Sequence, residues 1–379
     1  MRIYTPGYYN TRFGELWDKG LRELAIEAAT GALEVAAMSL NDIDAIYISN
    51  MCASRFSGQD HLGALIASDL HTSIPSCHIE AACASGSVAI RTAFLDIMSG
   101  TSNNVLVIGV EKMSDVTIDM ATTGLTGASD EEWEAYYGAT FPSLYAMIAR
   151  AHMNKYKTTK EQLALTAVKN HQNATLNPKA HFRKPITVEE VIRAPMVADP
   201  LGLYDCSPIS DGAAAIILSN KHKKGAQLLS IEQAQASIAL HDRNDITKLE
   251  ATVQAAGKAY TKTNLKPTDI SIMEVHDCFT IAEICAYEDL GLVEKGKGGQ
   301  LIESGKVNID GSIPVNTSGG LKAAGHPVGA TGIKQAVEII SQLSGNAKER
   351  QVKHDLKYGL THNVGGSGAT CVVGIWGKI

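Results

Sequence analysis

The sequence contains no apolar run of about 18 residues, which is the length that a membrane-spanning helix needs. Its first residues, MRIYTPGYYNTRFGEL, also lack the apolar stretch of a secretory signal peptide. The seven cysteines form no CxxC pair, and a chain of 379 residues does not depend on a disulfide framework. We therefore expect reduced thiols and a soluble, cytoplasmic protein without a membrane partner.

Basic residues are not in excess. Lysine and arginine number 34 against 40 aspartates and glutamates, so the formal net charge is −6 and no global basic field exists for nucleic acid. Walker, GxGxxG and zinc-finger spacings are absent as well. We expect no nucleic-acid partner, no metal and no permanently bound cofactor.

What the sequence does contain is an alternation of β-type runs with stretches in which apolar residues recur three and four positions apart. The expected strands cover residues 45–51, 76–81, 105–110, 213–218, 228–236, 270–275, 313–316, 359–363 and 370–376. The expected helices cover residues 21–38, 85–98, 159–173, 246–261, 281–290 and 333–343. This alternation indicates an α/β protein with largely parallel, buried sheets.

The order of these elements repeats along the chain. In each half, a strand ends in a loop of small residues and a helix follows. We interpret residues 1–222 and 223–379 as two similar α/β units. Residues 115–206 interrupt the first unit without β alternation. We expect them to form a cap over a site, because long insertions in compact domains are usually functional or disordered.

The motif AACASGS places Cys83 between an expected strand and an expected helix. The unpaired N–H groups and the dipole at a helix N-terminus stabilise a thiolate nucleophile, and they could hold an oxyanion. The alternative is a buried structural cysteine, which is the commoner environment of this residue type. This motif alone does not decide between the two.

The motif GGLKAAGHPVGATG presents His326 in a loop ahead of another expected helix. Its glycines permit unusual backbone angles and close ligand approach, while Pro327 stiffens the turn. The position corresponds to that of Cys83 in the first half. We therefore favour a base over a solvated surface histidine.

Two further motifs end strands in the second half. EVHDCF offers His276 as a proton donor and Cys278 as a second thiol, and we expect Asp277 to cap the helix that follows. LTHNVGGSGAT ends in a glycine-rich turn, where the amides around Gly365 and Gly366 could complete an oxyanion hole. A plain tight turn is the structural alternative.

Together and in this order, AACASGS, EVHDCF, GGLKAAGHPVGATG and THNVGGSGAT closely resemble the motifs of the thiolase family, over essentially the whole chain. The resemblance implies the α/β thiolase fold, a five-layered αβαβα arrangement of two similar βαβαβαββ halves with an inserted cap or loop domain. It also implies a homodimer or homotetramer. The implied chemistry is ping-pong acyl transfer between coenzyme A thioesters through an acyl group on Cys83.

The resemblance also implies residue roles. His326 would activate Cys83 and, with His276 or a water bound to it, would stabilise the thioester enolate oxygen. The amides of Cys83 and Gly365 would form the other oxyanion hole.

The chain departs from the commonest thiolases in two linked places. Those proteins carry NEAF where this chain has HDCF, and a CxG cysteine where Asn363 begins NVG. The proton-shuttling cysteine is therefore missing from its usual position. The combination is similar to that of the archaeal and sterol-carrier-protein-type thiolases, which implies Cys278 as the replacement acid and base.

These implications lead us to expect an acetyl-CoA C-acetyltransferase that condenses two acetyl-CoA into acetoacetyl-CoA and CoA for the mevalonate pathway. The archaeal subgroup implies HMG-CoA synthase and a zinc-containing OB-fold scaffold protein as partners.

Other functions remain open at this point. Degradative cleavage of longer or branched 3-ketoacyl-CoAs is the close alternative, and its chain-length preference would depend on cap residues such as Met113, Met120, Phe141 and Met147. A decarboxylating ketoacyl synthase also uses one cysteine and two histidines, but the additional Cys278 favours a thiolase. HMG-CoA synthase would need a catalytic glutamate that no motif supplies. The complete set of four reactive side chains argues against a non-catalytic scaffold subunit.

Overall fold

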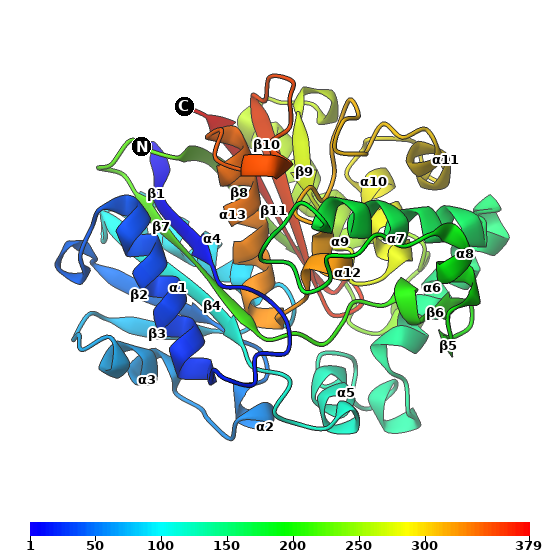
Figure 1. Cartoon of the computed structure of the whole chain (residues 1–379), viewed down its shortest axis with the longest axis horizontal. Helices are drawn as coiled ribbons and strands as arrows, with labels where there is room; N and C mark the ends of the chain where they lie inside the picture. The colour runs from blue at the N-terminus through cyan, green and yellow to red at the C-terminus, as the bar shows by residue number, and fades with distance from the viewer.

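The computed structural model describes residues 1–379, and its main feature is one hydrogen-bonded sheet of nine strands in the order β3-β2-β4-β7-β1-β8-β11-β10-β9 (Figure 1). The first half of the chain supplies β1 (Ile3–Asn10), β2 (Ala45–Ser49), β3 (Ser76–Ile79), β4 (Asn104–Glu111) and β7 (Gly212–Ser219). The second half supplies β8 (Ala226–Gln235), β9 (Ile272–Glu274), β10 (Tyr358–Gly365) and β11 (Thr370–Lys378). Within the sheet, the two halves are hydrogen-bonded to each other only where the start of β1 pairs with β8.

Most neighbouring strands of this sheet are antiparallel. Only the β2–β3, β2–β4 and β9–β10 pairs are parallel. The expectation of largely parallel sheets was therefore wrong. β10 and β11 form a hairpin, and such a short connection cannot return a chain in the parallel sense. β1 lies between β7 and β8 and is antiparallel to both.

Helices lie on both outer faces and between the two halves of the sheet. Along β4, Val105 and Val107 pack against α4 (Ser85–Ser99) and α13 (Thr331–Leu343), whereas Leu106 and Ile108 face the opposite way. The outer helices are α1 (Leu21–Ala36) and α3 (Leu62–Asp69) on the first half, and α9 (Glu250–Thr263) and α10 (Thr280–Asp289) on the second. This is the αβαβα layering that the resemblance implies.

Residues 115–206, here called the cap segment, connect β4 to β7 on one side of the molecule (Figure 1). The segment is mainly helical, and a two-stranded ladder closes it. Its elements are α5 (Ile118–Thr126), α6 (Phe141–Tyr156), α7 (Lys160–Ala174), α8 (Val188–Arg193), β5 (Met196–Ala198) and β6 (Leu201–Gly202). α6 and α7 contact α10, and α7 also contacts α11 (Gly298–Glu303) and α12 (Gly320–Ala324). These contacts bring the cap segment against the second half.

Two strand predictions differ from the structure for reasons of backbone chemistry. β1 was not predicted because Pro6 and Gly7 interrupt its sequence, and its pairing with β7 shifts register at that point. The expected strand at 313–316 is reduced to a single bridge between Met273 and Val315. The adjoining Pro314 has no N–H to donate. None of the helices combines the length and the apolar character needed to cross a bilayer.

Candidate active site

Cys83 lies in a tight turn between β3 and α4. Ala82 has a φ of 52°, in the left-handed region, which costs a residue with a Cβ roughly 1–2 kcal/mol. The Ser85 hydroxyl holds the turn, since it accepts a hydrogen bond from the Ala81 amide (2.8 Å) and donates one to the Ala82 carbonyl (2.6 Å). The turn places the thiol at the N-terminus of α4, as the sequence predicts.

The pKa of the Cys83 thiol is raised to about 12, chiefly because the surrounding protein removes its sulfur from water. The amides of Gly366 and of Cys83 itself face the sulfur and act in the opposite direction, while the carboxyl group of Glu111 adds to the rise. The effect of burial on the pKa therefore exceeds that of the helix N-terminus. This pKa predicts a neutral resting thiol where the sequence led us to expect a stabilised thiolate.

This raised pKa predicts how Cys83 reacts with iodoacetamide as the pH changes. The thiolate fraction rises about tenfold per pH unit below the thiol pKa. The alkylation rate should therefore keep rising from pH 7 to pH 10 without a plateau, when followed by mass spectrometry of the Cys83 peptide. Cys77, which is exposed on β3, provides an internal comparison. A plateau near neutral pH would contradict a neutral resting thiol.

His326 is held as a neutral base. Its Nδ1 lies 2.7 Å from the hydroxyl of Thr331, which donates its own proton to the Pro327 carbonyl (2.8 Å). The hydroxyl must therefore accept from Nδ1–H, and this leaves a lone pair on Nε2. Burial, together with the nearby Lys334 ammonium, lowers the pKa of His326 to about 3, so the ring stays neutral until it receives a proton.

His276 is held in the opposite tautomer by Asn363. The Asn363 amide donates to the Cys83 carbonyl (2.9 Å), which can only accept, and this fixes which side-chain atom is nitrogen. The same nitrogen lies 3.2 Å from Nδ1 of His276, so Nδ1 accepts and Nε2 carries the proton. Nε2 is buried without a hydrogen-bond partner. Burial, followed by the nearby His326, lowers the pKa of His276 well below its usual value.

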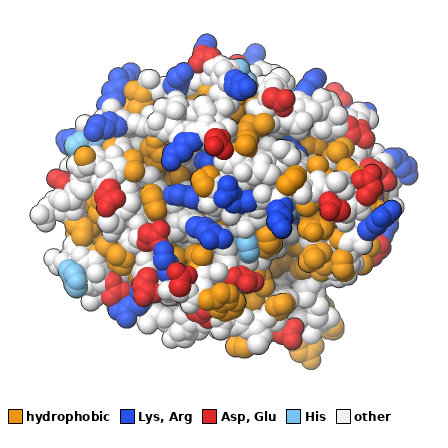
Figure 2. Space-filling view, viewed as in Figure 1, with side chains coloured by type: hydrophobic (Ala, Val, Ile, Leu, Met, Phe, Trp, Pro, Cys, Tyr) orange, Lys and Arg blue, Asp and Glu red, His pale blue; other side chains and the backbone are white.

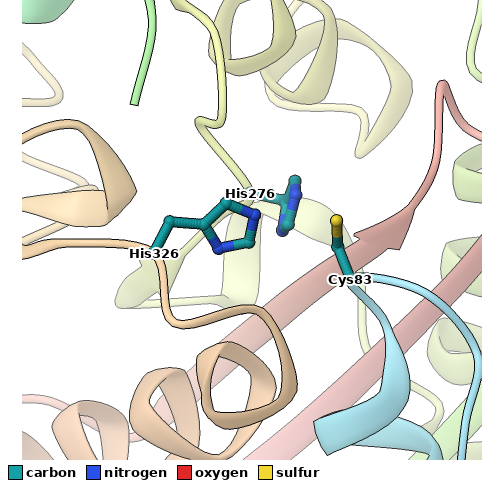
Figure 3. Close-up of side chains that lie close together, drawn as sticks. All are labelled: Cys83, His276 and His326. Atoms are coloured by element: carbon teal, nitrogen blue, oxygen red, sulfur yellow. The ribbon is translucent and has the colours of Figure 1, made fainter. Parts of the chain in front are cut away.

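The two rings meet at Cys83 (Figure 3). The sulfur and one ring nitrogen of each histidine all lie within 4.8 Å of one another, and the His276 and His326 rings meet edge to face with centroids 5.2 Å apart. A zinc ion would need a lone pair on each inward nitrogen. One ring nitrogen of His276 carries a proton and the other accepts from Asn363, so His276 offers no free lone pair and the cluster fits proton transfer better than a resident metal.

A cavity of about 200 Å³ opens over this cluster. Cys83, His326 and Cys278 all line it, and the remaining lining is mostly apolar. Cys278 is almost fully buried, and burial raises the pKa of its thiol far above the usual range. Two thiols and one imidazole therefore border one small, mostly apolar space, and the buried His276 ring lies next to the Cys83 and His326 side chains.

Other expected site residues are placed differently. The Gly366 amide faces the Cys83 sulfur, so Gly366 is a further candidate beside Gly365 for the second oxyanion donor. Asp277 accepts hydrogen bonds from the Leu321 and Lys322 amides, and it therefore caps α12 and not α10, the helix that follows it.

Two of the four residues expected to set chain length lie away from the cavity. Met113 and Phe141 line it. Met120 and Met147 are about half exposed and do not line it. Neither Met120 nor Met147 is placed to limit the length of an acyl group on Cys83.

Comparison with known proteins agrees with this geometry. The family model described as "Thiolase, N-terminal domain" matches residues 7–222, and "Thiolase C-terminal domain-like" matches residues 233–378. The chain belongs to the thiolase family. It is 52% identical to an acetyl-CoA acetyltransferase of Methanothermobacter thermautotrophicus, with 98% of each chain covered. It is also 33% identical to sterol carrier protein 2 of Bos taurus, covering 98% of this chain and 71% of that one. The first of these relatives and the family models support an acyltransferase.

Solved structures share the thiolase fold at lower identity. One, described as "Ltp2-ChsH2(DUF35) aldolase", has a TM-score of 0.86 at 22% identity, covering 100% of this chain and 98% of that one. Human mitochondrial 3-ketoacyl-CoA thiolase, solved in complex with CoA, has a TM-score of 0.76 at 17% identity, covering 100% and 98%. The motif-based resemblance to thiolases is thus confirmed.

Several side chains that hold this thiolase site were not found from the sequence. A buried pair of Lys334 and Glu274 is one example. The Lys334 ammonium on α13 contacts Glu274 (3.3 Å), the Ser318 hydroxyl (2.5 Å) and the Gly320 carbonyl (3.1 Å). Glu274 lies two residues before His276, so the pair ties α13 to both histidine loops. No local motif marks it, because its members are 60 residues apart.

Breaking this pair should destabilise the protein. Lys334→Met is expected to lower the free energy of unfolding by about 3–5 kcal/mol, because it leaves a buried carboxylate without its partner. The double variant Lys334→Met/Glu274→Gln should lose less unfolding free energy, because it leaves no buried charge unpaired. Urea unfolding measures both, and Lys378→Met, which removes an exposed ion pair, serves as the control. Equal losses in the single and double variants would contradict a role for the charge pair.

Proposed function

We propose that the protein is an acetyl-CoA C-acetyltransferase that converts two acetyl-CoA into acetoacetyl-CoA and CoA through an acetyl group on Cys83. The observation that carries the proposal is that Cys83, His326 and Cys278 line one cavity of about 200 Å³, while a ring nitrogen of His276 lies within 4.8 Å of the Cys83 sulfur. A space of this size suits a short acyl chain and the thiol end of CoA. The 52% identical archaeal relative bears the same activity in its name.

In the first half-reaction, the Cys83 sulfur attacks the acetyl-CoA carbonyl while its proton passes to Nε2 of His326. The developing oxyanion would accept hydrogen bonds from the amides of Cys83 and Gly366. As the tetrahedral intermediate collapses, the CoA sulfur leaves and takes the proton of Cys278. Acetyl-Cys83, protonated His326 and a Cys278 thiolate remain.

In the second half-reaction, the Cys278 thiolate removes a methyl proton from a second acetyl-CoA. The enolate oxygen would be stabilised by the Nε2–H groups of His276 and His326. The enolate carbon attacks acetyl-Cys83, and acetoacetyl-CoA forms as the Cys83 thiolate leaves. His326 returns its proton to Cys83, and every group regains its starting state. Coenzyme A enters only as part of the substrates and product.

The proposal is tested by assaying the purified protein in both directions. Acetyl-CoA should yield acetoacetyl-CoA, and thiolysis of acetoacetyl-CoA should have a higher kcat/KM than thiolysis of longer or branched 3-ketoacyl-CoAs. A preference for the longer substrates would favour a degradative thiolase. Failure of acetyl-CoA to protect or acetylate Cys83 would favour a non-catalytic scaffold.

We also propose a homodimer or homotetramer in the cytoplasm. β3 forms one edge of the sheet, and Leu95 and Met98 on the adjacent α4 are exposed. A free edge beside exposed apolar side chains favours pairing with a second copy. Sedimentation and a β3-edge variant such as Cys77→Pro would test this, since proline disrupts edge pairing.

A scaffold partner is proposed for the cap segment. Figure 2 shows hydrophobic side chains gathered at the lower right, the side where Figure 1 places this segment. The exposed hydrophobic side chains of the cap segment include those of Ile118, Met120, Trp133, Tyr136 and Tyr137. One structural neighbour, the Ltp2-ChsH2(DUF35) aldolase, carries a DUF35 component in its name. We propose that a zinc-containing OB-fold protein covers this patch and links the enzyme to HMG-CoA synthase in the mevalonate pathway, which co-purification of the three proteins would test.

A further inference from the structure

Tyr145 reaches the active site from the cap segment, although no catalytic motif contains it. The residue lies on α6 with 1% of its surface exposed, and it lines the same cavity as Cys83 and Cys278. Its hydroxyl donates a hydrogen bond to the Gly366 carbonyl at 3.1 Å. The amide of the same Gly366 faces the Cys83 sulfur. The phenol is therefore attached to the turn that we assign to the oxyanion hole.

The other side of this phenol faces Cys278. The Tyr145 ring stacks on Phe279, with centroids 4.6 Å apart and planes 24° apart, so it is fixed against the residue next to Cys278. Tyr145 and Cys278 line the same cavity and pack in one cluster of buried side chains, and the phenol acts to lower the pKa of the Cys278 thiol. A hydroxyl lowers a thiol pKa by donating to the thiolate, so the phenol O–H can serve the Gly366 carbonyl and the Cys278 sulfur in turn. The hydroxyl thus connects the second thiol to the oxyanion turn.

The turn that contains Gly366 is also held by Arg243, independently of Tyr145. Gly366 has a φ of 64°, which a residue with a side chain rarely adopts. The neighbouring Ser367 accepts hydrogen bonds from the Arg243 guanidinium through its carbonyl (2.7 Å) and its hydroxyl (3.0 Å). Loss of the Tyr145 hydroxyl would therefore leave the turn in place and would mainly release Cys278.

We propose that Tyr145 is a positioning residue for the condensation step, where its hydroxyl directs the Cys278 thiol toward the substrate cavity. This inference rests on the proposed function, in which Cys278 first gives its proton to CoA and then takes one from the second acetyl-CoA. Both transfers need the sulfur within hydrogen-bond reach of the reacting atom. It also explains why a cap helix buries a polar aromatic side chain beside two thiols.

Tyr145→Phe tests the inference, because it removes one oxygen atom and keeps the ring that stacks on Phe279. We expect kcat for condensation to fall roughly 10- to 100-fold. The KM for acetyl-CoA should stay within about twofold, and the rate of Cys83 acetylation, measured by rapid quench and mass spectrometry, within about threefold. Tyr260→Phe is the matched control, since it removes a phenol that donates to the Leu290 carbonyl outside the cavity. Tyr260→Phe should change neither the rate of condensation nor the rate of Cys83 acetylation.

The outcomes separate the two proposals. Unchanged condensation in Tyr145→Phe would overturn the role of Tyr145. So would equal losses in acetylation and condensation, which would place its effect on the oxyanion turn alone. A melting temperature close to that of Tyr260→Phe verifies that the fold is intact. Absence of condensation in the unmodified enzyme would overturn the proposed function itself, and this inference with it.

Discussion

Cys278→Ala should lose condensation while Cys83 still accepts an acetyl group. Removing the base that takes the methyl proton in the second half-reaction is expected to lower kcat for acetoacetyl-CoA formation by about 10²- to 10⁴-fold. Acetylation of Cys83 should lose much less, because CoA leaves readily as a thiolate that solvent can protonate. Mass spectrometry of the Cys83 peptide after mixing with acetyl-CoA, alongside a steady-state assay, measures both reactions.

Cys285→Ala provides the matched control. Cys285 is another buried thiol of the same region, seven residues further along the chain, but it does not line the cavity. Its removal should leave both half-reactions intact. Normal condensation in Cys278→Ala would show that another group moves the α-proton. An equal loss of acetylation would show that solvent does not replace Cys278 in protonating CoA.

Asn363→Asp should reverse the hydrogen-bond pattern of His276. In the unmodified protein, the Asn363 amide donates to Nδ1 of His276, which keeps the proton on Nε2. A carboxylate would instead accept from Nδ1–H, so the neutral ring would lose its inward proton. We expect condensation at pH 8 to fall roughly 10²- to 10³-fold, which is the usual cost of losing one oxyanion donor.

The condensation rate of Asn363→Asp should depend on pH in a direction that distinguishes this variant from Asn363→Ala. A buried carboxylate raises the pKa of the adjacent imidazole, and below that pKa both ring nitrogens carry protons. Condensation by Asn363→Asp should therefore partly recover as the pH falls from 8 toward 6. Asn363→Ala removes the contact without supplying a negative charge, so its loss should not recover in this way. Identical pH profiles for the two variants would contradict the assigned tautomer.

Zinc binding is a second readout for the same variant. Once Nε2 of His276 has a free lone pair, it and Nε2 of His326 can join the Cys83 thiolate as ligands. Asn363→Asp should therefore bind Zn²⁺ more tightly than the unmodified enzyme, as measured by calorimetry or by competition with a chromogenic chelator. Equal affinities would argue that Asn363 does not exclude metal.

The positions of the reactive side chains were predictable because each depends on local sequence. Cys83 and His326 each precede a helix, and His276 and Cys278 follow a short strand. Turns of small residues and amphipathic repeats identify such places without tertiary information. The repeat of strand, loop and helix in the two halves likewise indicated that the cysteine loop and the histidine loop occupy equivalent positions.

Strand direction and the β1 strand were not predictable in this way. Alternating elements suggested parallel pairing, but the sense of each pair depends on which distant strands become neighbours. β1 was missed because its central Pro6 and Gly7 argue against a strand. In the structure Gly7 lies so close to α1 that an added Cβ would be 2.2 Å from the Ala32 carbonyl oxygen. That packing requirement appears only when the helix is placed on the sheet.

The sequence by itself determined the family and the layered fold and predicted Cys83 as the nucleophile, because these depend on motifs whose chemistry is local. Only the tertiary structure shows the surroundings that set the charge of this thiol. At the N-terminus of α4, Cys83 has the donors that favour a thiolate, yet burial raises its pKa to about 12. The opposite tautomers of His326 and His276 likewise depend on Thr331 and Asn363. Proton positions follow from the complete set of neighbours, most of which are distant in the chain.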